Sequence, residues 1–220
     1  MVKKIWWKIT AVLLITYSLI GGLLFDVPRL PILNESIRNL YYHVPMWFSM
    51  VVMMTISMIC AIQYLRRPSF LSDAHSVAFA KTGMLFGCLG IITGMIWAKF
   101  TWGEYWSGDP KQNASAIALL IYAAYFLLRS SFSEEQQRNR LSAIYNIFAF
   151  AAYIPLIFVL PRLTDSLHPG NGGNPGFNAY DLDSKLRLVF YPTVVGWILL
   201  GVWLASLEAR IQLIRYKRSV

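Results

Sequence analysis

Two histidines and a cluster of aromatic residues carry the side chains of this 220-residue chain that are best suited to chemistry. His43 lies in the segment YYHVPMW and His168 in SLHPG, while Trp102, Tyr105 and Trp106 crowd into the stretch FTWGEYWSGDPKQNAS. A neutral imidazole is a strong ligand for haem iron, and flat aromatic side chains can cover the face of a planar ring. These residue types indicate a bis-histidine site for a planar iron macrocycle, provided that the fold brings them together.

The elements that must position these residues are apolar helices. Hydrophobic residues make up 56% of the chain and charged residues only 14%, against roughly a quarter charged in a typical soluble domain. The first apolar run follows the basic MVKK without a small-residue cleavage pattern after it, so we expect a retained helix. The sequence predicts an all-α integral membrane bundle, one domain over residues 1–220, with six transmembrane helices: Ile9–Phe25, Met46–Leu65, Thr82–Ala98, Ala114–Leu128, Leu141–Leu160 and Leu188–Leu207.

The distribution of charge predicts the orientation of this bundle. The segments that share a side with the two termini hold 13 of the 20 basic residues and only four acidic ones. The positive-inside rule therefore places both termini in the cytoplasm and the opposite loops, at about residues 26–45, 99–113 and 161–187, on the outer side of the membrane. The net charge of +9 then favours contact with anionic lipid, and the chain shows no folded basic module for nucleic acid.

His43 is expected at a corner of the chain. Residues Asn34–Tyr42 have helical spacing and predict a short interfacial helix capped by Asn34. Pro45 is expected to change the chain direction, because the residue before a proline avoids the helical region. His43 would then lie beside the membrane surface, just before the second span.

The tryptophan-rich stretch has both a binding and a purely structural interpretation. The spacing of Trp102, Tyr105 and Trp106 predicts one side of a helical turn, which Trp47, Trp97 and Phe100 would extend. Gly103 and Gly108 would let the backbone approach a flat ligand. Asp109 and Pro110 form a good cap and first turn for the fourth span. An ordinary aromatic belt at the membrane surface would show similar residues, and the two loop histidines are what favour a binding site.

Other polar residues have plainer interpretations. His75 is expected to be a solvated residue of an inner loop, and Cys60 and Cys88 to be packing residues within spans. The Gly-rich and Asn-rich run at residues 169–178 looks like a loop. Several cations share the face of the two histidines and are candidates to pair with propionates: Arg38, Lys99, Lys111 and Lys185.

Three of these motifs resemble one known family. The segment WGEYWSGDPKQ resembles the tryptophan-rich signature Trp-Gly-x-x-Trp-x-Trp-Asp of haem-handling proteins in cytochrome c biogenesis, and here Trp102, Gly103, Trp106 and Asp109 match it. YYHVPMW and SLHPG resemble the two outer histidine segments of its six-helix branch, the haem exporter C or cytochrome c maturation protein C family. Gly108 stands where the signature has its third tryptophan, and DPKQ looks more like the larger cytochrome c synthetases of the superfamily.

The resemblance implies a carrier in a bacterial inner membrane that presents haem b on the outer, periplasmic face and is not itself an enzyme. It implies His43 and His168 as axial ligands of the iron, and Trp47, Trp102, Gly103, Tyr105, Trp106 and Asp109 as further binding residues. The implied partners are a membrane-tethered haem chaperone, an ATP-binding cassette complex and a small single-span subunit.

Three other functions compete with this interpretation. A b-type haem oxidoreductase would place paired histidines inside the bilayer, whereas no histidine lies within a span that the sequence predicts. A transporter would show ionisable residues or broken helices at membrane depth, and the spans offer only Pro155 and Pro192 as candidate kinks. Part of a haem-attachment synthetase remains a third alternative.

Overall fold

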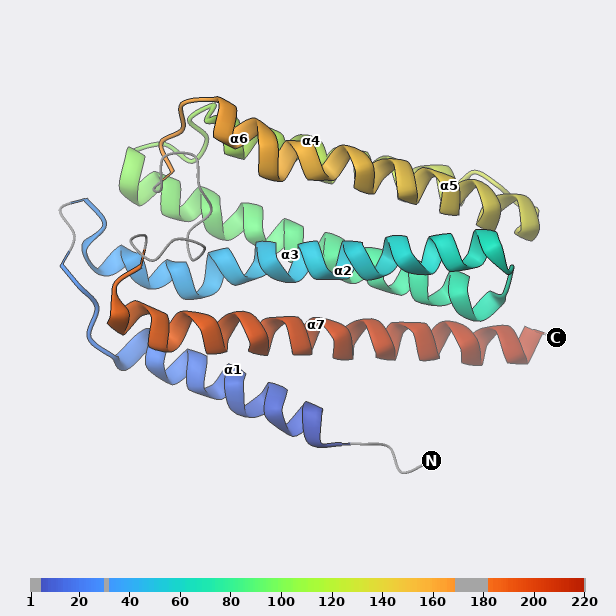
Figure 1. Cartoon of the computed structure of the whole chain (residues 1–220), viewed down its shortest axis with the longest axis horizontal. Coiled ribbons are helices and arrows are strands. Elements are labelled where there is room, and N and C mark those ends of the chain that lie inside the picture. Colours follow the sequence, from blue (N-terminus) through green and yellow to red (C-terminus); the bar gives the residue numbers. More distant parts are fainter. Residues whose placement is uncertain (1–4, 30–31, 169–181, 220) are drawn as a thin grey trace.

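The computed structural model describes residues 5–29, 32–168 and 182–219, and this part of the chain contains six helical segments long and apolar enough to cross a membrane (Figure 1). The all-α fold with six spans is therefore confirmed. Its elements are α1 (Trp6–Leu24), η1 (Asn34–Asn39), α2 (Leu40–Arg66), α3 (Phe70–Trp102), α4 (Pro110–Ser130), α5 (Glu135–Ile154), η2 (Pro155–Val159), α6 (Leu160–Leu163) and α7 (Ser184–Ser219).

Helix α3 is much longer than the predicted span. It begins at Phe70, where the Ser69 hydroxyl caps it by accepting from the Ser72 amide, and it runs to Trp102. The expectation that His75 lies in a solvated loop is therefore wrong, because His75 sits within α3 and its Nδ1 lies 2.8 Å from the Leu71 carbonyl oxygen. Hydropathy marks the part of a helix that lipid can cover, and polar first turns such as this one extend beyond it.

The expected corner before the second span is absent. The short helix appears as the 3₁₀ helix η1, with Leu33 at its cap position and Asn34 at a φ of 42°, so Asn34 is not the cap. η1 leads directly into α2, and Pro45 lies inside that helix. A proline removes one backbone hydrogen bond, a loss that membrane helices tolerate. His43 is consequently a residue of the first turns of α2, not of a loop.

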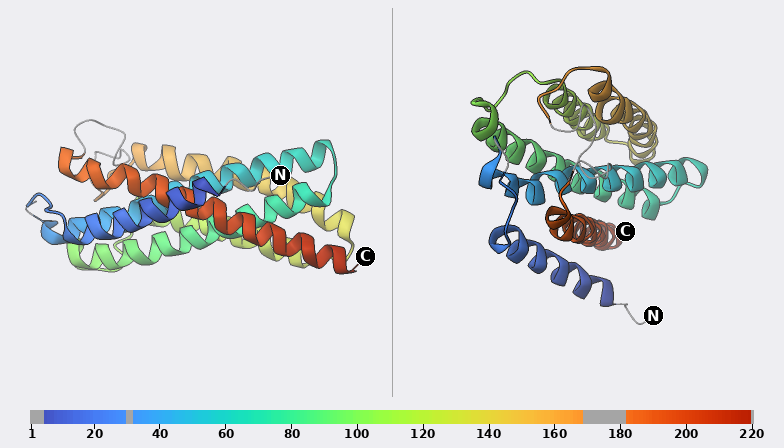
Figure 2. Two further views of the ribbon diagram at one scale, coloured as in Figure 1. Left: turned by 90° about the horizontal axis from the view of Figure 1, so that it is seen from below. Right: turned by 60° about the vertical axis from the view of Figure 1, so that its left-hand side comes forward.

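The helices pack in layers. α2 and α3 form the central antiparallel pair, α7 contacts both of them, and α1 packs on α7 (Figure 1). On the opposite face of the α2–α3 pair lie α4 and α5, with η2 and α6 continuing α5; the two views of Figure 2 show the same order. This arrangement leaves α1 at one edge and the α4–α5 pair at the other.

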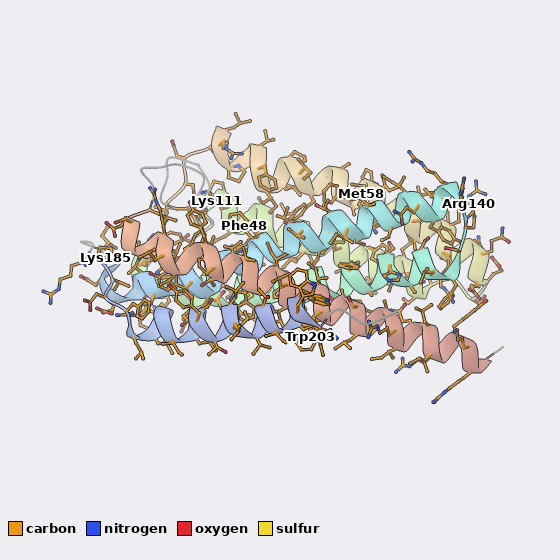
Figure 3. The ribbon with its side chains drawn as sticks, turned by 60° about the horizontal axis from the view of Figure 1, so that its bottom comes forward. Phe48, Met58, Lys111, Arg140, Lys185 and Trp203 are labelled. Carbon is orange, nitrogen blue, oxygen red and sulfur yellow. The ribbon has the colours of Figure 1, made fainter. Side chains whose placement is uncertain are left out.

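The loops gather at the two ends of the bundle. The described parts of residues 25–39, 103–109 and 164–168 lie at one end, on the left in Figure 1, which we call the aromatic end. The turns at 67–69 and 131–134 and the end of α7 lie at the other, the basic end. Lys111 and Lys185 mark the aromatic end in Figure 3, and Arg140 marks the basic end. The expected loop at residues 169–178 falls outside the described residues.

Polar contacts fasten the α4–α5 pair to the rest of the bundle near the basic end. Arg129 of α4 pairs with Asp73 of α3 through two hydrogen bonds of 2.9 and 2.5 Å, and also donates to Asn139 of α5. Deeper in the bundle, Asn146 of α5 donates to the Ser57 hydroxyl of α2 at 2.8 Å. These contacts tie the two layers together at the end opposite the histidines.

Candidate functional site

A cavity of about 810 Å³ opens at the aromatic end. Its walls come from α2 and α3 on one side and from α4, η2 and α6 on the other, and its volume lies within the roughly 300–1,000 Å³ of small-molecule sites. Most of the lining is apolar. The residues with aromatic or imidazole rings that line it are His43, Trp47, Phe48, Trp97, Trp102, Trp106, Phe158 and His168. The structure thus brings together both predicted histidines and three of the four tryptophans and tyrosines that the sequence singled out as binding residues.

His43 is held by backbone and hydroxyl oxygens of α3. Its Nδ1 lies 3.0 Å from the Gly90 carbonyl oxygen and 3.2 Å from the Thr93 hydroxyl. Because the carbonyl can only accept, Nδ1 carries the hydrogen in the neutral ring and Nε2 keeps its lone pair. The ring also meets Trp97 and Trp47 edge to face, with centroids 5.9 and 6.4 Å apart.

A stripe of glycines on α3 makes room for this ring. A Cβ atom on Gly94 would lie 2.6 Å from His43 Cε1, and one on Gly90 would lie 2.9 Å from the Trp47 ring. Further along the stripe, Gly87 and Gly83 face Met50 and Met54 of α2 in the same way. Small residues at such spacing let membrane helices approach closely. The spacing of the glycines in GMLFGCLGIITG was visible in the sequence, and it indicates a helix face that another helix can approach closely, although not which residues lie opposite.

His168 is held by a carboxylate. Its Nδ1 lies 3.0 Å from Asp109 Oδ1, and the same carboxylate accepts from the Leu167 amide at 2.7 Å and from the Ser166 hydroxyl at 2.9 Å. Asp109 is also the N-cap of α4, where it accepts from the Lys111 amide at 2.8 Å. The predicted cap is therefore confirmed, and one side chain connects the start of α4 to the segment that carries His168.

The electrostatics of this pair favour a neutral imidazole beside an ionised carboxylate. Burial lowers the pKa of His168 to about 4, although Asp109 acts to raise it. Burial acts to raise the pKa of Asp109, but His168 and the hydrogen-bond donors outweigh it, so that this pKa lies below its usual range. At neutral pH the His168 Nδ1–H therefore donates to Asp109, and Nε2 retains the lone pair needed to bind a metal.

The tryptophan-rich segment does not form the predicted helical turn. α3 ends at Trp102, because Gly103 adopts a left-handed φ of 85°. Trp102 and Trp106 nevertheless both line the cavity, and the Trp102 ring lies 4.9 Å from that of His168. Tyr105 points elsewhere: it is 55% exposed, outside the described lining, with Lys99 Nζ 5.7 Å from its ring centroid.

Comparison with known proteins decides the family. The profile of the "Heme exporter protein C" family matches residues 2–220. The chain belongs to this family. It is 26% identical over 189 residues to the "Heme exporter protein C" of Haemophilus influenzae, covering 83% of this chain and 73% of that protein. It is also 38% and 37% identical over 79 residues to the "Cytochrome c biogenesis protein CcsA" of two Synechococcus strains, CC9902 and CC9605. Those matches cover 36% of this chain, which spans about a quarter of either CcsA protein (26%).

Gly108 is the point where this member of the haem exporter protein C family leaves the tryptophan-rich signature. It has a φ of 74°, and a Cβ atom built on it would meet nothing within 4 Å. Any residue with a Cβ atom, tryptophan included, would therefore be strained here by the positive φ. Gly103 likewise has no other protein atom within 4 Å of the position of a Cβ, so within the protein itself the positive φ is what calls for glycine at both positions.

Three of the four candidate cations, Lys111, Lys99 and Arg38, lie in different surroundings. Lys111 lines the cavity. Lys99 donates to the Gly103 carbonyl oxygen at 2.7 Å. Arg38 pairs with Glu35 and donates to two carbonyl oxygens of the α1 end and the loop after it. Within the described lining, Lys111 is the candidate that can meet an anionic group of a bound molecule.

Proposed function

We propose that this member of the haem exporter protein C family binds haem b in the cavity at the aromatic end, with His43 and His168 as axial ligands of the iron. One observation carries the proposal. Two histidines from distant parts of the chain line the same cavity, and each is held through Nδ1 so that Nε2 is left for a metal. Among the described residues, neither Nε2 has a hydrogen-bond partner.

The rest of the cavity suits a flat and mostly apolar cargo. Trp47, Trp97, Trp102 and Trp106 offer rings for stacking and exclude water from the axial positions. Lys111 supplies a positive charge for a propionate. Gly103 and Asp109 support the site from outside the described lining, the first by turning the loop and the second by holding His168. Tyr105 also lies outside the lining, beside Lys99.

The role we assign is that of a carrier and not of a bond-making enzyme. In c-type cytochrome biogenesis, the chain would present haem to a membrane-tethered haem chaperone, beside an ATP-binding cassette complex and a small single-span subunit. The excess of basic residues near the basic end supports an orientation in which that end faces the cytoplasm and the cavity faces the periplasm of the inner membrane.

Two alternatives each have one observation in their favour. A b-type haem oxidoreductase binds haem through histidines on membrane helices, and His43 lies on such a helix, α2, although the sequence predicted it just before the second span. His168 lies outside the helices, however, so the second ligand would come from the surface of the bundle. The similarity to the CcsA proteins favours part of a haem-attachment synthetase, which would also need a haem site of this kind.

Absorption spectra of the purified protein test the proposal. Wild type should copurify with haem whose oxidised spectrum is low-spin, and both His43→Ala and His168→Ala should lose that spectrum while remaining inserted in the membrane. His75→Ala is a matched control, because His75 lies in α3 near the basic end and its Nδ1 also faces a helix carbonyl. An unchanged low-spin spectrum in the double mutant of His43 and His168 would refute the ligand assignment.

A further inference from the structure

We propose that Asp109 is the positioning residue for His168, and that its negative charge makes this imidazole the stronger donor of the two axial ligands. The inference rests on the proposed function, because it assigns the regulation of the iron site formed there. Asp109 does not itself touch the cargo in this scheme. It acts on the iron through the imidazole.

The geometry fixes both the direction and the tautomer of the His168 ring. The Asp109 side chain is fully buried, and its two oxygens accept hydrogen bonds from three consecutive residues: the Ser166 hydroxyl, the Leu167 amide and His168 Nδ1. The same carboxylate caps α4. The position of the ring is therefore fixed relative to the start of a 21-residue helix, and not only relative to its own loop.

The two histidines have unequal partners. His43 Nδ1 faces a carbonyl oxygen and a hydroxyl, both neutral, whereas His168 Nδ1 faces a carboxylate. A charge-assisted hydrogen bond at Nδ1 pulls the proton away from the ring and raises the basicity of Nε2. A more basic ligand stabilises the ferric iron relative to the ferrous iron. Asp109 should therefore hold the reduction potential of bound haem at a lower value than a neutral partner would.

The variant Asp109→Asn separates the charge from the helix cap, because asparagine caps helices about as well as aspartate. We expect the haem affinity to fall about 10-fold to 100-fold, as is usual when a partner of a metal-bound histidine is lost. We also expect the reduction potential of the haem that remains to become more positive. Glu134→Gln is the matched control, since Glu134 is the carboxylate cap of α5 at the basic end and should change neither quantity.

A double-mutant cycle decides whether Asp109 acts through the imidazole. If it does, Asp109→Asn produces no further shift in potential when His168 is already alanine. An equal shift in both backgrounds would mean that the charge acts directly on the haem, which would overturn the inference.

The same cycle separates failure of the inference from failure of the proposed function. If His168→Ala abolishes the low-spin spectrum but Asp109→Asn leaves affinity and potential unchanged, the inference is wrong and the ligand assignment stands. If His168→Ala leaves the spectrum unchanged, the ligand assignment itself is wrong. Should Asp109→Asn fail to fold, Asp109→Ser keeps a good capping residue for α4 and removes the carboxylate, and unchanged haem affinity and reduction potential there would overturn the proposal.

Discussion

The close approach of α3 to His43 offers a sharp test of the site, through the variant Gly94→Ala. The new Cβ atom would lie 2.6 Å from His43 Cε1 and 3.2 Å from Nδ1, whereas ordinary contacts begin at 3.4 Å. The ring must therefore move by at least the difference, 0.8 Å, or the helices must separate by a similar amount. The ring cannot yield freely, because its Nδ1 is bound to the Gly90 carbonyl oxygen.

The variant should stay folded and yet lose affinity for haem. Replacing a helical glycine by alanine favours the helix by about 1 kcal/mol, and overpacking costs about 1–3 kcal/mol, so the net loss of stability is at most about 2 kcal/mol. A shift of 0.8 Å is a large fraction of an iron–nitrogen bond of about 2 Å. Misplacement on this scale costs up to about 100-fold in function, so we expect haem affinity to fall about 10-fold to 100-fold.

The assay is haem titration of the purified variant, with thermal unfolding measured in parallel. Gly83→Ala is the control on the same helix face: its Cβ would meet the end of the flexible Met54 side chain at 2.9 Å, far from the histidines, so it should bind haem as the wild type does. If Gly94→Ala binds haem with wild-type affinity and a low-spin spectrum, the geometry described for His43 is not what ligates the iron.

Three further perturbations test other parts of the structure. Trp102→Ala combined with Trp106→Ala should weaken haem retention while the spectrum of the remaining haem stays low-spin. Normal haem retention in this variant would show that the two rings do not help to hold haem. Burial lowers the pKa of His168 to about 4, so about nine-tenths of the His168 rings stay neutral at pH 5. The haem spectrum should therefore be the same at pH 8 and pH 5. Loss of the spectrum between pH 7 and pH 6, where an ordinary histidine protonates, would contradict this expectation. Arg129→Met should destabilise the fold by about 3–5 kcal/mol, because it leaves Asp73 buried without its partner, and the added change Asp73→Leu should recover much of this loss in a thermal unfolding assay.

The six helices could be predicted from the sequence because a bilayer imposes length and apolarity on each span. Their true ends could not, because polar residues that find partners inside the protein do not end a helix. Asp73 illustrates this: it lies outside the predicted span Thr82–Ala98, yet it belongs to α3 and pairs with Arg129 of α4. Pro45 likewise predicted a change of chain direction before the second span, but it lies inside α2. A membrane helix tolerates a proline when its surroundings compensate for the lost backbone hydrogen bond.

The two histidines and three tryptophans, Trp47, Trp102 and Trp106, that line the cavity could be named from residue type and order, which do not depend on the exact ends of the helices. What holds these residues was not found. Gly90 and Gly94 matter because of what stands opposite them on α2, and the sequence does not show which residues face each other across two helices. Asp109 was read correctly as a cap, but its contact with His168 joins positions 59 residues apart and depends on the tertiary fold.

The two histidines differ in a way that suits a carrier. His43 is a residue of a long helix, wedged against α3 and held by the backbone of that helix. His168 lies outside the helices, and the contacts of its ring to Asp109 and Ser166 hold it at the start of α4. Separating that one carboxylate from residues 166–168 would release three hydrogen bonds at once and free one of the two proposed axial ligands, while His43 stays in place. An acceptor that supplies its own ligand would then need to compete at His168 alone, which makes transfer possible without unfolding the helical part of the site.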